Sequence, residues 1–286
     1  MRILSSIPSP SISYFDVGPL RIHFYAVFIL IGIAAAILIG NRRLVARGAQ
    51  SWVVLDIALW TVPFGIIGAR LFHVLTHFTD YFGLGKSPMD IFSVWNGGLA
   101  IYGALILGGF GAFVGCQQAG IKFLSFVDAM APGVLLAQAI GRWGNYFNQE
   151  LFGKPTDLPW ALAIDRPNSA IPTGLPTSAV FHPTFAYEML WSLVGVALLL
   201  ILEKRIDLRW GRLFAMYLTY YSIGRFWIEG LRIDPSDIYF GLRTNQWSAV
   251  LTALVGVALY MYSKRRHTGA ENTIYTAKKL SADNAS

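Results

Sequence analysis

The sequence predicts an all-α membrane protein with about seven transmembrane helices and a small extracytoplasmic cap. Its 286 residues are 55% hydrophobic and 14% charged, which is typical of multi-span membrane proteins and unlike soluble ones. Apolar runs long enough to cross a hydrocarbon core of ~30 Å recur along the chain. The proline-rich segment 151–183 is too polar and broken to span, so we expect it to form the cap, with a short strand over Trp160–Asp165.

Seven apolar runs mark the expected spans, and each is flanked by polar, basic, Gly or Pro residues. Their approximate limits are Leu20–Gly40, Val53–Phe78, Leu99–Gln117, Phe126–Phe147, Thr184–Leu202, Leu213–Leu231 and Trp247–Tyr262. Residues 1–267 then form one multi-span domain. Residues 268–286 are polar and lack periodicity, so we expect a disordered cytoplasmic tail.

Basic residues are distributed unequally between the two sides of the expected bundle. The first, third and fifth loops and the C-terminal tail carry thirteen Lys and Arg residues, and the opposite side carries seven. The positive-inside rule therefore predicts an N-terminus outside and a C-terminus in the cytoplasm. The net charge of +7 is accounted for by contact with anionic lipid, so it does not indicate a nucleic-acid partner.

A polar stretch, Gly141–Gly153, closes the fourth apolar run. Gln138, Arg142, Asn145 and Gln149 share one helical face there. An unpaired arginine in lipid costs about 2.5–3.5 kcal/mol, so we expect Arg142 to have an anionic partner. That partner is either a ligand or, if Arg142 is structural, a carboxylate on a neighbouring helix.

The sixth span ends with a second charged face that carries Tyr221, Arg225, Glu229 and Arg232. Arg225 and Glu229 are four residues apart and form a natural intrahelical pair. The alternative to a binding role is therefore structural: Arg225 and Glu229 would only compensate each other's charge. Glu188 lies just inside the fifth span.

Two features of the second and third spans point toward an anion. Arg70 shares a face with His73 near the outer headgroups, although snorkelling would also explain this arginine. The Asn96-Gly97-Gly98 turn before the third span could offer backbone N–H groups to an anion, or could be a plain turn.

The chain has one cysteine and no Cys/His cluster with metal-ligand spacing. An internal disulfide is therefore excluded, and we expect neither a metal nor a cofactor.

These motifs resemble those of the prolipoprotein diacylglyceryl transferase family, over most of the chain from His23 to the seventh span. The most specific part is Gly141-Arg142-x-Gly144-Asn145-x-x-Asn148-x-Glu150-x-x-Gly153. Two further motifs follow in the order of the family: His182-Pro183 with Tyr187-Glu188, and Gly224-Arg225 with Glu229 and Arg232.

The resemblance implies an enzyme of the bacterial cytoplasmic (inner) membrane with its active site toward the extracytoplasmic side. Such enzymes move the diacylglyceryl group of phosphatidylglycerol onto the lipobox cysteine thiol of prolipoprotein signal peptides. They leave a thioether and release glycerol phosphate. The implied partners are phosphatidylglycerol, these signal peptides and membrane lipids.

The resemblance also implies the site residues. The catalytic ones are Arg142, Arg225 and Tyr102, and the substrate-binding ones are Tyr25, Arg70, Asn145, Asn148, Glu150, Gly153, Glu188, Glu229 and Arg232. One position departs from the family, because its proposed catalytic histidine aligns with Tyr102 here.

The chemistry of the residues agrees with this reaction. Expulsion of a phosphate monoester builds negative charge on the leaving oxygen, and guanidinium groups such as those of Arg142 and Arg225 bind phosphate bidentately. Two other classes would also place arginines among helices: a transporter for an anionic substrate and a different phospholipid-headgroup enzyme. Transporters usually show internal repeats and broken helices, which are not evident in this sequence.

Overall fold

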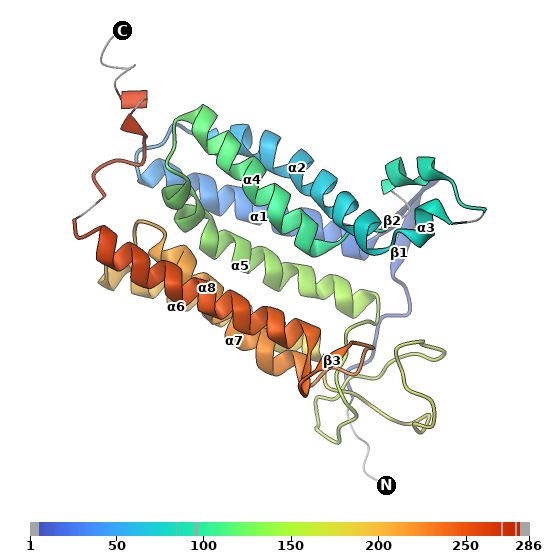
Figure 1. Cartoon of the computed structure of the whole chain (residues 1–286). Coiled ribbons are helices and arrows are strands. Elements are labelled where there is room, and N and C mark those ends of the chain that lie inside the picture. Colours follow the sequence, from blue (N-terminus) through green and yellow to red (C-terminus); the bar gives the residue numbers. More distant parts are fainter. Residues whose placement is uncertain (1–5, 84, 95–96, 270, 278, 281–286) are drawn as a thin grey trace. The chain divides into compact units, whose positions relative to one another are not determined.

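The computed structural model describes residues 6–83, 85–94, 97–269, 271–277 and 279–280, and Trp95 and Asn96 of the glycine turn lie outside these ranges. The long helices are α1 (Phe24–Ala46), α2 (Val53–Thr76), α4 (Ile101–Ala119), α5 (Phe123–Phe147), α6 (Thr184–Arg205), α7 (Arg212–Glu229) and α8 (Thr244–Arg266) (Figure 1). Two short helices, α3 (Thr79–Phe82) and η1 (Pro88–Phe92), separate α2 from α4. Two antiparallel hairpins pair β1 (Tyr14–Val17) with β2 (Leu20–His23), and β3 (Ile238–Tyr239) with β4 (Leu242–Arg243).

Within the described residues, six helices are long and apolar enough to cross a membrane: α1, α2, α4, α5, α6 and α8. The protein is therefore a multi-pass helical membrane protein, as the composition predicted. The helix α7 occupies the position of the remaining predicted span. It is absent from the six because its 18 residues include Arg212, Arg225 and Glu229.

The first span begins and ends later than predicted. Leu20 does not start a helix, because it pairs with Val17 in the β1–β2 hairpin. Helix α1 runs from Phe24 to Ala46 and continues beyond Gly40 through two arginines. Hydropathy locates the span but not the hairpin, whose second strand contributes apolar residues, Leu20 and Ile22, directly before the helix.

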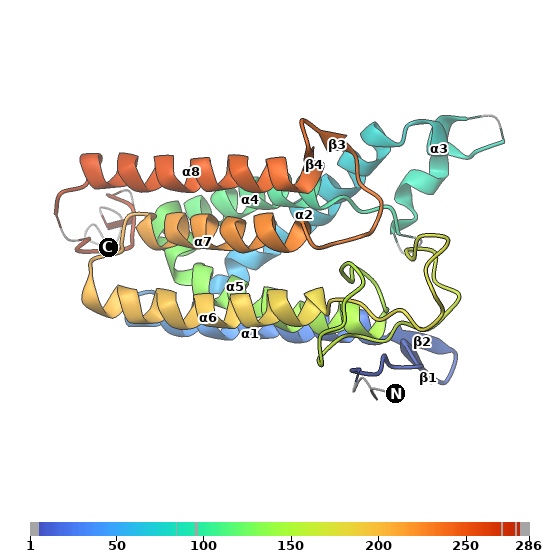
Figure 2. The same cartoon turned by 90° about the horizontal axis from the view of Figure 1, so that it is seen from below.

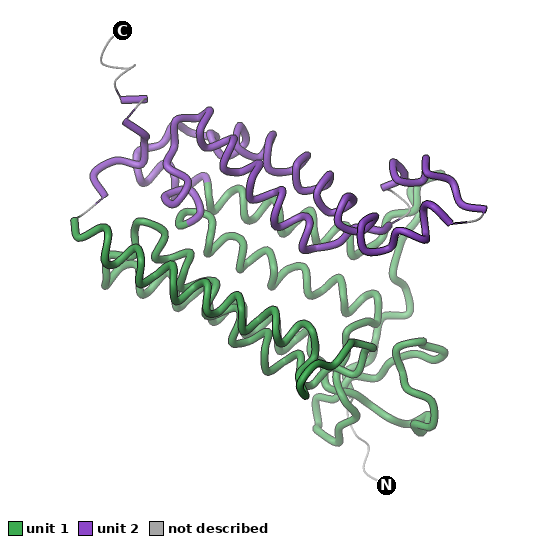
Figure 3. The backbone as a smooth tube through the Cα atoms, in the orientation of Figure 1, with its two compact units in different colours: residues 1–40, 128–270 green, residues 41–127, 271–286 purple. Residues whose placement is uncertain are grey.

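The chain divides into two compact units (Figure 3), and each is described by itself. The first, residues 1–40 and 128–270, contains α6, α7 and α8, with α7 lying between the other two (Figure 2). Small residues permit this close packing. A Cβ on Gly224 would overlap the Trp191 ring, and one on Gly195 would overlap the Tyr220 ring. Larger side chains at either glycine would push α6 and α7 apart.

Asp128 of α5 caps α7 from a neighbouring helix. Its carboxylate is fully buried, and its two oxygens accept hydrogen bonds from the backbone N–H groups of Gly211 (2.7 Å) and Phe214 (2.8 Å). The first turn of a helix has unpaired N–H groups and a positive dipole end. A carboxylate there stabilises the helix both by accepting hydrogen bonds and by its attraction to the dipole. This contact fixes the start of α7 against α5.

The segment 151–183 has its own small hydrophobic core, formed by Phe152, Leu162, Ile164 and Phe181 together with Phe185 of α6. The predicted strand over Trp160–Asp165 is wrong in extent, because only isolated bridges form there. Leu162 pairs with Ile7 on one side and with Phe181 on the other. The prolines nearby limit the length of any ladder.

In the second unit, residues 41–127 and 271–286, α2 and α4 pack along a row of glycines. A Cβ on Gly68 or Gly103 would overlap the facing backbone, so the two helices approach to backbone contact there.

The C-terminal tail contributes to the second unit. Tyr275 forms a bridge with Ile121, and Ile274 accepts a hydrogen bond from the N–H of Lys122 (2.8 Å). Glu271 and Ile274 are buried. These contacts differ from the disorder expected for the tail, because two buried side chains fix a segment that is otherwise polar. Residues 281–286 lie outside the described part of the chain.

Candidate active site

The predicted polar residues of the first unit gather where several helices end. They come from the C-terminal ends of α5 and α7, the N-terminal end of α6, and the hairpin that leads into α8 (Figure 2). Helix α5 stops at Phe147 because the chain reverses. Gln149 and Leu151 have left-handed φ angles of 51° and 58°. This turn directs the Glu150 side chain back toward the helix.

Glu188 joins the two arginines that the sequence singles out. Its Oε2 lies 2.7 Å from Nη2 of Arg142, and its Oε1 lies 3.5 Å from Nη1 of Arg225. The expected anionic partner of Arg142 is thus confirmed as a carboxylate of α6. The Glu188 side chain is only 6% exposed, whereas those of Arg142 and Arg225 are 18% and 19% exposed. Both arginine side chains are therefore partly exposed, while one buried carboxylate holds their guanidinium groups together.

Asn145 extends the network to the end of α5. Its side-chain oxygen accepts a hydrogen bond from Nη1 of Arg142 (3.0 Å), and its nitrogen donates to Oε1 of Glu150 (2.7 Å). Asn148 donates to the same oxygen (3.3 Å). The predicted polar stripe therefore holds at Arg142 and Asn145. It fails at Gln149, which lies beyond the helix and donates to Asp165 instead.

Glu229 is the most deeply buried carboxylate of the cluster, with a side chain that is 0% exposed. The predicted intrahelical pair is confirmed, because Oε2 of Glu229 lies 2.8 Å from Nη2 of Arg225. The same oxygen lies 3.3 Å from Nη1 of Arg232. Two arginines on one oxygen compensate a charge that would otherwise be costly to bury.

Sequence reasoning missed two members of this network, Asp234 and Arg243. Asp234 forms a two-pronged ion pair with Arg232 at 2.7 and 2.9 Å. Arg243 lies 2.9 Å from Oε1 of Glu229 and 3.2 Å from Oδ2 of Asp234. Both residues lie outside the predicted spans, so the cost of a charge in lipid does not single them out. The signal available for Asp234 was the excess of arginines over carboxylates on the face that carries Arg225, Glu229 and Arg232.

Two further predicted residues, Gly153 and Tyr25, border the network. Gly153 forms a bridge with Arg232, and a Cβ there would lie 2.7 Å from Cβ of His182. A glycine thus allows the cap to meet the end of α7. Tyr25 of α1 packs against Gly144, where a Cβ would lie 3.1 Å from the tyrosine Cα, and its ring is near enough to Arg142 to interact with it electrostatically.

The predicted residue Arg70 belongs to the second unit and is buried. Its guanidinium donates to backbone carbonyls of η1, at Ile91 (2.7 Å) and Asp90, and of the turn before α4, at Gly97 (2.8 Å) and Gly98 (3.0 Å). Gly97 and Gly98 both have positive φ angles, so the glycine pair forms a turn that directs its carbonyls at Arg70. Its binding role stays a prediction.

Tyr102, at the start of α4, also belongs to the second unit. Its side chain is 38% exposed, and its ring lies 6.1 Å from that of Phe72. A partly exposed tyrosine at this position is compatible with a ligand, and the catalytic role assigned to Tyr102 stays a prediction.

His182 lies beside the site, at the end of the cap. Its Nδ1 lies 3.1 Å from the hydroxyl of Tyr187, which also accepts a hydrogen bond from Trp160 (3.0 Å). Burial lowers the pKa of His182, and the nearby Lys154 lowers this pKa further. The imidazole is therefore neutral at pH 7, where it serves as a hydrogen-bonding neighbour of Tyr187 rather than as a cation.

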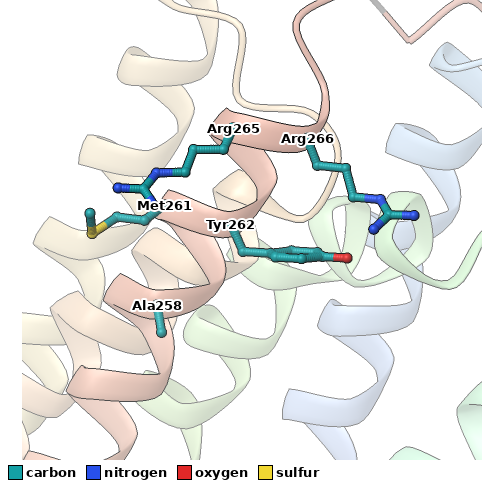
Figure 4. A pocket seen from close by; sticks show the side chains of 5 residues that line it. All are labelled: Ala258, Met261, Tyr262, Arg265 and Arg266. Carbon is teal, nitrogen blue, oxygen red and sulfur yellow. The ribbon is translucent and has the colours of Figure 1, made fainter.

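A surface pocket of about 440 Å³ lies elsewhere, near the C-terminal end of α8, and is lined by Ala258, Met261, Tyr262, Arg265 and Arg266. Its two arginines extend away from each other (Figure 4). The start of α8, where the arginine network lies, is on the order of 25 Å away along the helix axis at ~1.5 Å per residue. Among the described residues, no group of three or more His, Cys, Asp or Glu side chains could hold a metal ion.

Comparison with known proteins agrees with the motifs. Residues 13–262 match the family model for prolipoprotein diacylglyceryl transferase. The chain is 49% identical over 269 residues to phosphatidylglycerol–prolipoprotein diacylglyceryl transferase 2 of Streptomyces coelicolor, covering 94% of this chain and 84% of that protein. It is 48% identical over 279 residues to the corresponding transferase of Leifsonia xyli, with the same coverage. The chain therefore belongs to the prolipoprotein diacylglyceryl transferase family.

Proposed function

We propose that this protein transfers the diacylglyceryl group of phosphatidylglycerol to the lipobox cysteine thiol of prolipoproteins. The names of its relatives, phosphatidylglycerol–prolipoprotein diacylglyceryl transferases, contain both substrates. The structural observation that carries the proposal is that two partly exposed arginine side chains, Arg142 and Arg225, have their guanidinium groups held by the buried carboxylate of Glu188. Two fixed forks of this kind suit a phosphate with several oxygens.

The reaction breaks one C–O bond and forms one C–S bond. The thiolate sulfur attacks the carbon of the diacylglycerol that is bonded to the phosphate oxygen. The electrons of that C–O bond leave on the phosphate oxygen. The thiol proton is lost to the leaving phosphate or to water, so the products are a thioether and glycerol phosphate. A phosphodiester becomes a monoester, and negative charge therefore grows where Arg142 and Arg225 would bind.

The carboxylates of the site act on the arginines. Glu188 contacts both guanidinium groups, and Glu229 holds Arg225 from the other side. Glu150 reaches Arg142 through Asn145. Preorganised cations of this kind need no rearrangement while charge develops, and this is the main source of electrostatic catalysis.

The cationic site also favours the nucleophile. A cysteine thiol has an unperturbed pKa of about 8.5, and nearby cations stabilise its thiolate. The acceptor cysteine would arrive on the signal peptide.

We further propose that α7 is the seventh span, that the N-terminus faces outward, and that the active site opens toward the extracytoplasmic side of the bacterial inner membrane. The charges of α7 support its role as a span, because Arg225 and Glu229 neutralise each other near its end. Arg212, at its start, donates to Ser263 and His267. A helix with paired charges is far less costly to insert than its hydropathy suggests.

The orientation can be tested with fusion reporters. A reporter that is active only outside the cytoplasm should be silent when fused after Ser286 and active when inserted near Thr173, because basic residues concentrate on the C-terminal side. The opposite pattern would overturn both the orientation and the placement of the site.

Tyr102→Phe tests how the tyrosine takes part. A phenol with a pKa near 10 is a poor base at neutral pH, so we propose that Tyr102 hydrogen-bonds the lipid headgroup. Removal of the hydroxyl should then reduce turnover moderately and leave the pH–rate profile unchanged. A loss by the ~10²–10⁴-fold typical of a general base, with normal lipid binding, would contradict this role, and recovery of activity at high pH would identify Tyr102 as the base.

The transfer itself is tested by mass spectrometry of a lipobox peptide incubated with phosphatidylglycerol and the purified protein. The peptide should gain one diacylglyceryl group at its cysteine. Consumption of lipid without a mass gain would favour a headgroup hydrolase, and neither change would favour a transporter.

A further inference from the structure

The buried carboxylate of Glu229 contacts three arginines and one asparagine. Its Oε2 contacts Arg225 and Arg232, while its Oε1 lies 2.9 Å from Nε of Arg243 and 3.1 Å from Nδ2 of Asn245. Both oxygens are thus held from two sides. The position of this carboxylate fixes one of the two contacts that direct Arg225, the other being Glu188.

Arg243 uses all three of its nitrogens within the protein. Nε donates to Glu229 (2.9 Å), Nη1 to the carbonyl of Arg232 (3.1 Å), and Nη2 to the carbonyl of Asp234 (2.9 Å). The residue ends β4 and caps α8, so its backbone is fixed as well as its side chain. Figure 2 shows this hairpin at the start of α8, beside the C-terminal end of α7. Such an arginine is built to hold other groups rather than to bind substrate.

We propose that Arg243 is a positioning residue, which holds Glu229 so that Arg225 presents its guanidinium to the leaving phosphate. This proposal rests on the transfer reaction proposed above. Without Arg243, one oxygen of Glu229 would lose its strongest donor, and the carboxylate could rotate away from the geometry that directs Arg225. A lysine could restore one contact but not the three directions of the guanidinium fork.

The charges of this part of the network support the same conclusion. Four arginines form ion pairs with three carboxylates, which leaves one positive charge: Arg142, Arg225, Arg232 and Arg243 with Glu188, Glu229 and Asp234. Removal of Arg243 would cancel that surplus, so Glu229 would neutralise Arg225 more completely. Arg225 would then stabilise the charge that develops on the phosphate less well.

The test compares Arg243→Gln and Arg243→Lys with the unchanged protein in mixed micelles of detergent and phosphatidylglycerol. Loss of a hydrogen bond to a charged group corresponds to about 10- to 100-fold, so kcat of Arg243→Gln should fall by that factor. The KM for phosphatidylglycerol should stay unchanged, since the lost interaction is made in the transition state. The kcat of Arg243→Lys should lie between that of Arg243→Gln and that of the unchanged protein. This second variant keeps the test decisive if Arg243→Gln does not fold.

A double-mutant cycle separates positioning from a general structural role. In a Glu229→Gln background, Arg243→Gln should cost much less than it does alone, because the group through which it acts is already changed. Equal losses in both backgrounds would overturn the proposal, as would a raised KM with an unchanged kcat or full activity of Arg243→Gln.

The matched control is Arg21→Gln. Arg21 is exposed and pairs with the exposed Asp16, so its replacement should leave kcat unchanged. Inactivity of the unchanged protein would refute the transfer reaction itself, whereas an active protein with an equally active Arg243→Gln variant would refute only the positioning role.

Discussion

Arg142→Lys is expected to fold and yet to lose activity by about 10²–10³-fold, the loss typical of removing one preorganised donor from a developing oxyanion. Lysine can still pair with Glu188, which lies 2.7 Å from the present guanidinium, so the buried charge stays compensated. Its single nitrogen cannot offer a phosphate two parallel N–H donors while it also holds Glu188 and Asn145, because an ammonium lacks the planar fork. Initial rates with a lipobox peptide measure the loss, and thermal unfolding verifies the fold.

Arg21→Lys is the control for this prediction, since it makes the same chemical change at an exposed ion pair. It should retain full activity. Full activity of Arg142→Lys under the same conditions would contradict the role of Arg142 in phosphate binding and leave it as an internal ion-pair partner.

Glu229→Leu is expected to lower the free energy of unfolding by about 3–5 kcal/mol, the cost of removing one partner from a buried ion pair. Three arginines lie within 3.3 Å of this carboxylate, and its side chain is fully buried. Leucine would leave their charges uncompensated, whereas Glu229→Gln keeps two acceptor lone pairs and the shape. Unfolding of the three proteins in the same detergent measures the difference.

Glu229→Leu should lower the free energy of unfolding more than Glu229→Gln does. A Glu229→Leu protein as stable as the unchanged one would show that the network contributes nothing to folding, and the geometry described for Glu229 would then need another explanation.

The sequence predicted the spans and the paired arginines because both depend on local properties. Apolar length locates helices, and the cost of a charge in lipid demands a partner for Arg142. It could not identify Glu188 as that partner, because the two residues lie on different helices and meet only through the packing of α5 and α6. The Arg225–Glu229 pair was predictable because its residues are one helical turn apart.

Other features depended on the backbone or on distant contacts. Gln149 left the predicted stripe because the chain turns at a left-handed residue, and helical periodicity cannot show where a helix stops. Arg243 was missed because it lies in a hairpin outside the spans. The cap strand failed for a similar reason, since isolated bridges at Leu162 depend on Ile7 and Phe181, which are distant in sequence.

The measurement that tests the central claim most directly follows both products of one reaction. Purified protein is incubated with phosphatidylglycerol labelled in its headgroup glycerol and with a lipobox peptide, and the thioether peptide and released glycerol phosphate are quantified. The two should appear in a ratio of one to one, both should disappear when the peptide cysteine is replaced by serine, and both should fall together in Arg142→Lys. Release of glycerol phosphate without a lipidated peptide, or at an unchanged rate with the serine peptide, would contradict the assignment of this site to diacylglyceryl transfer.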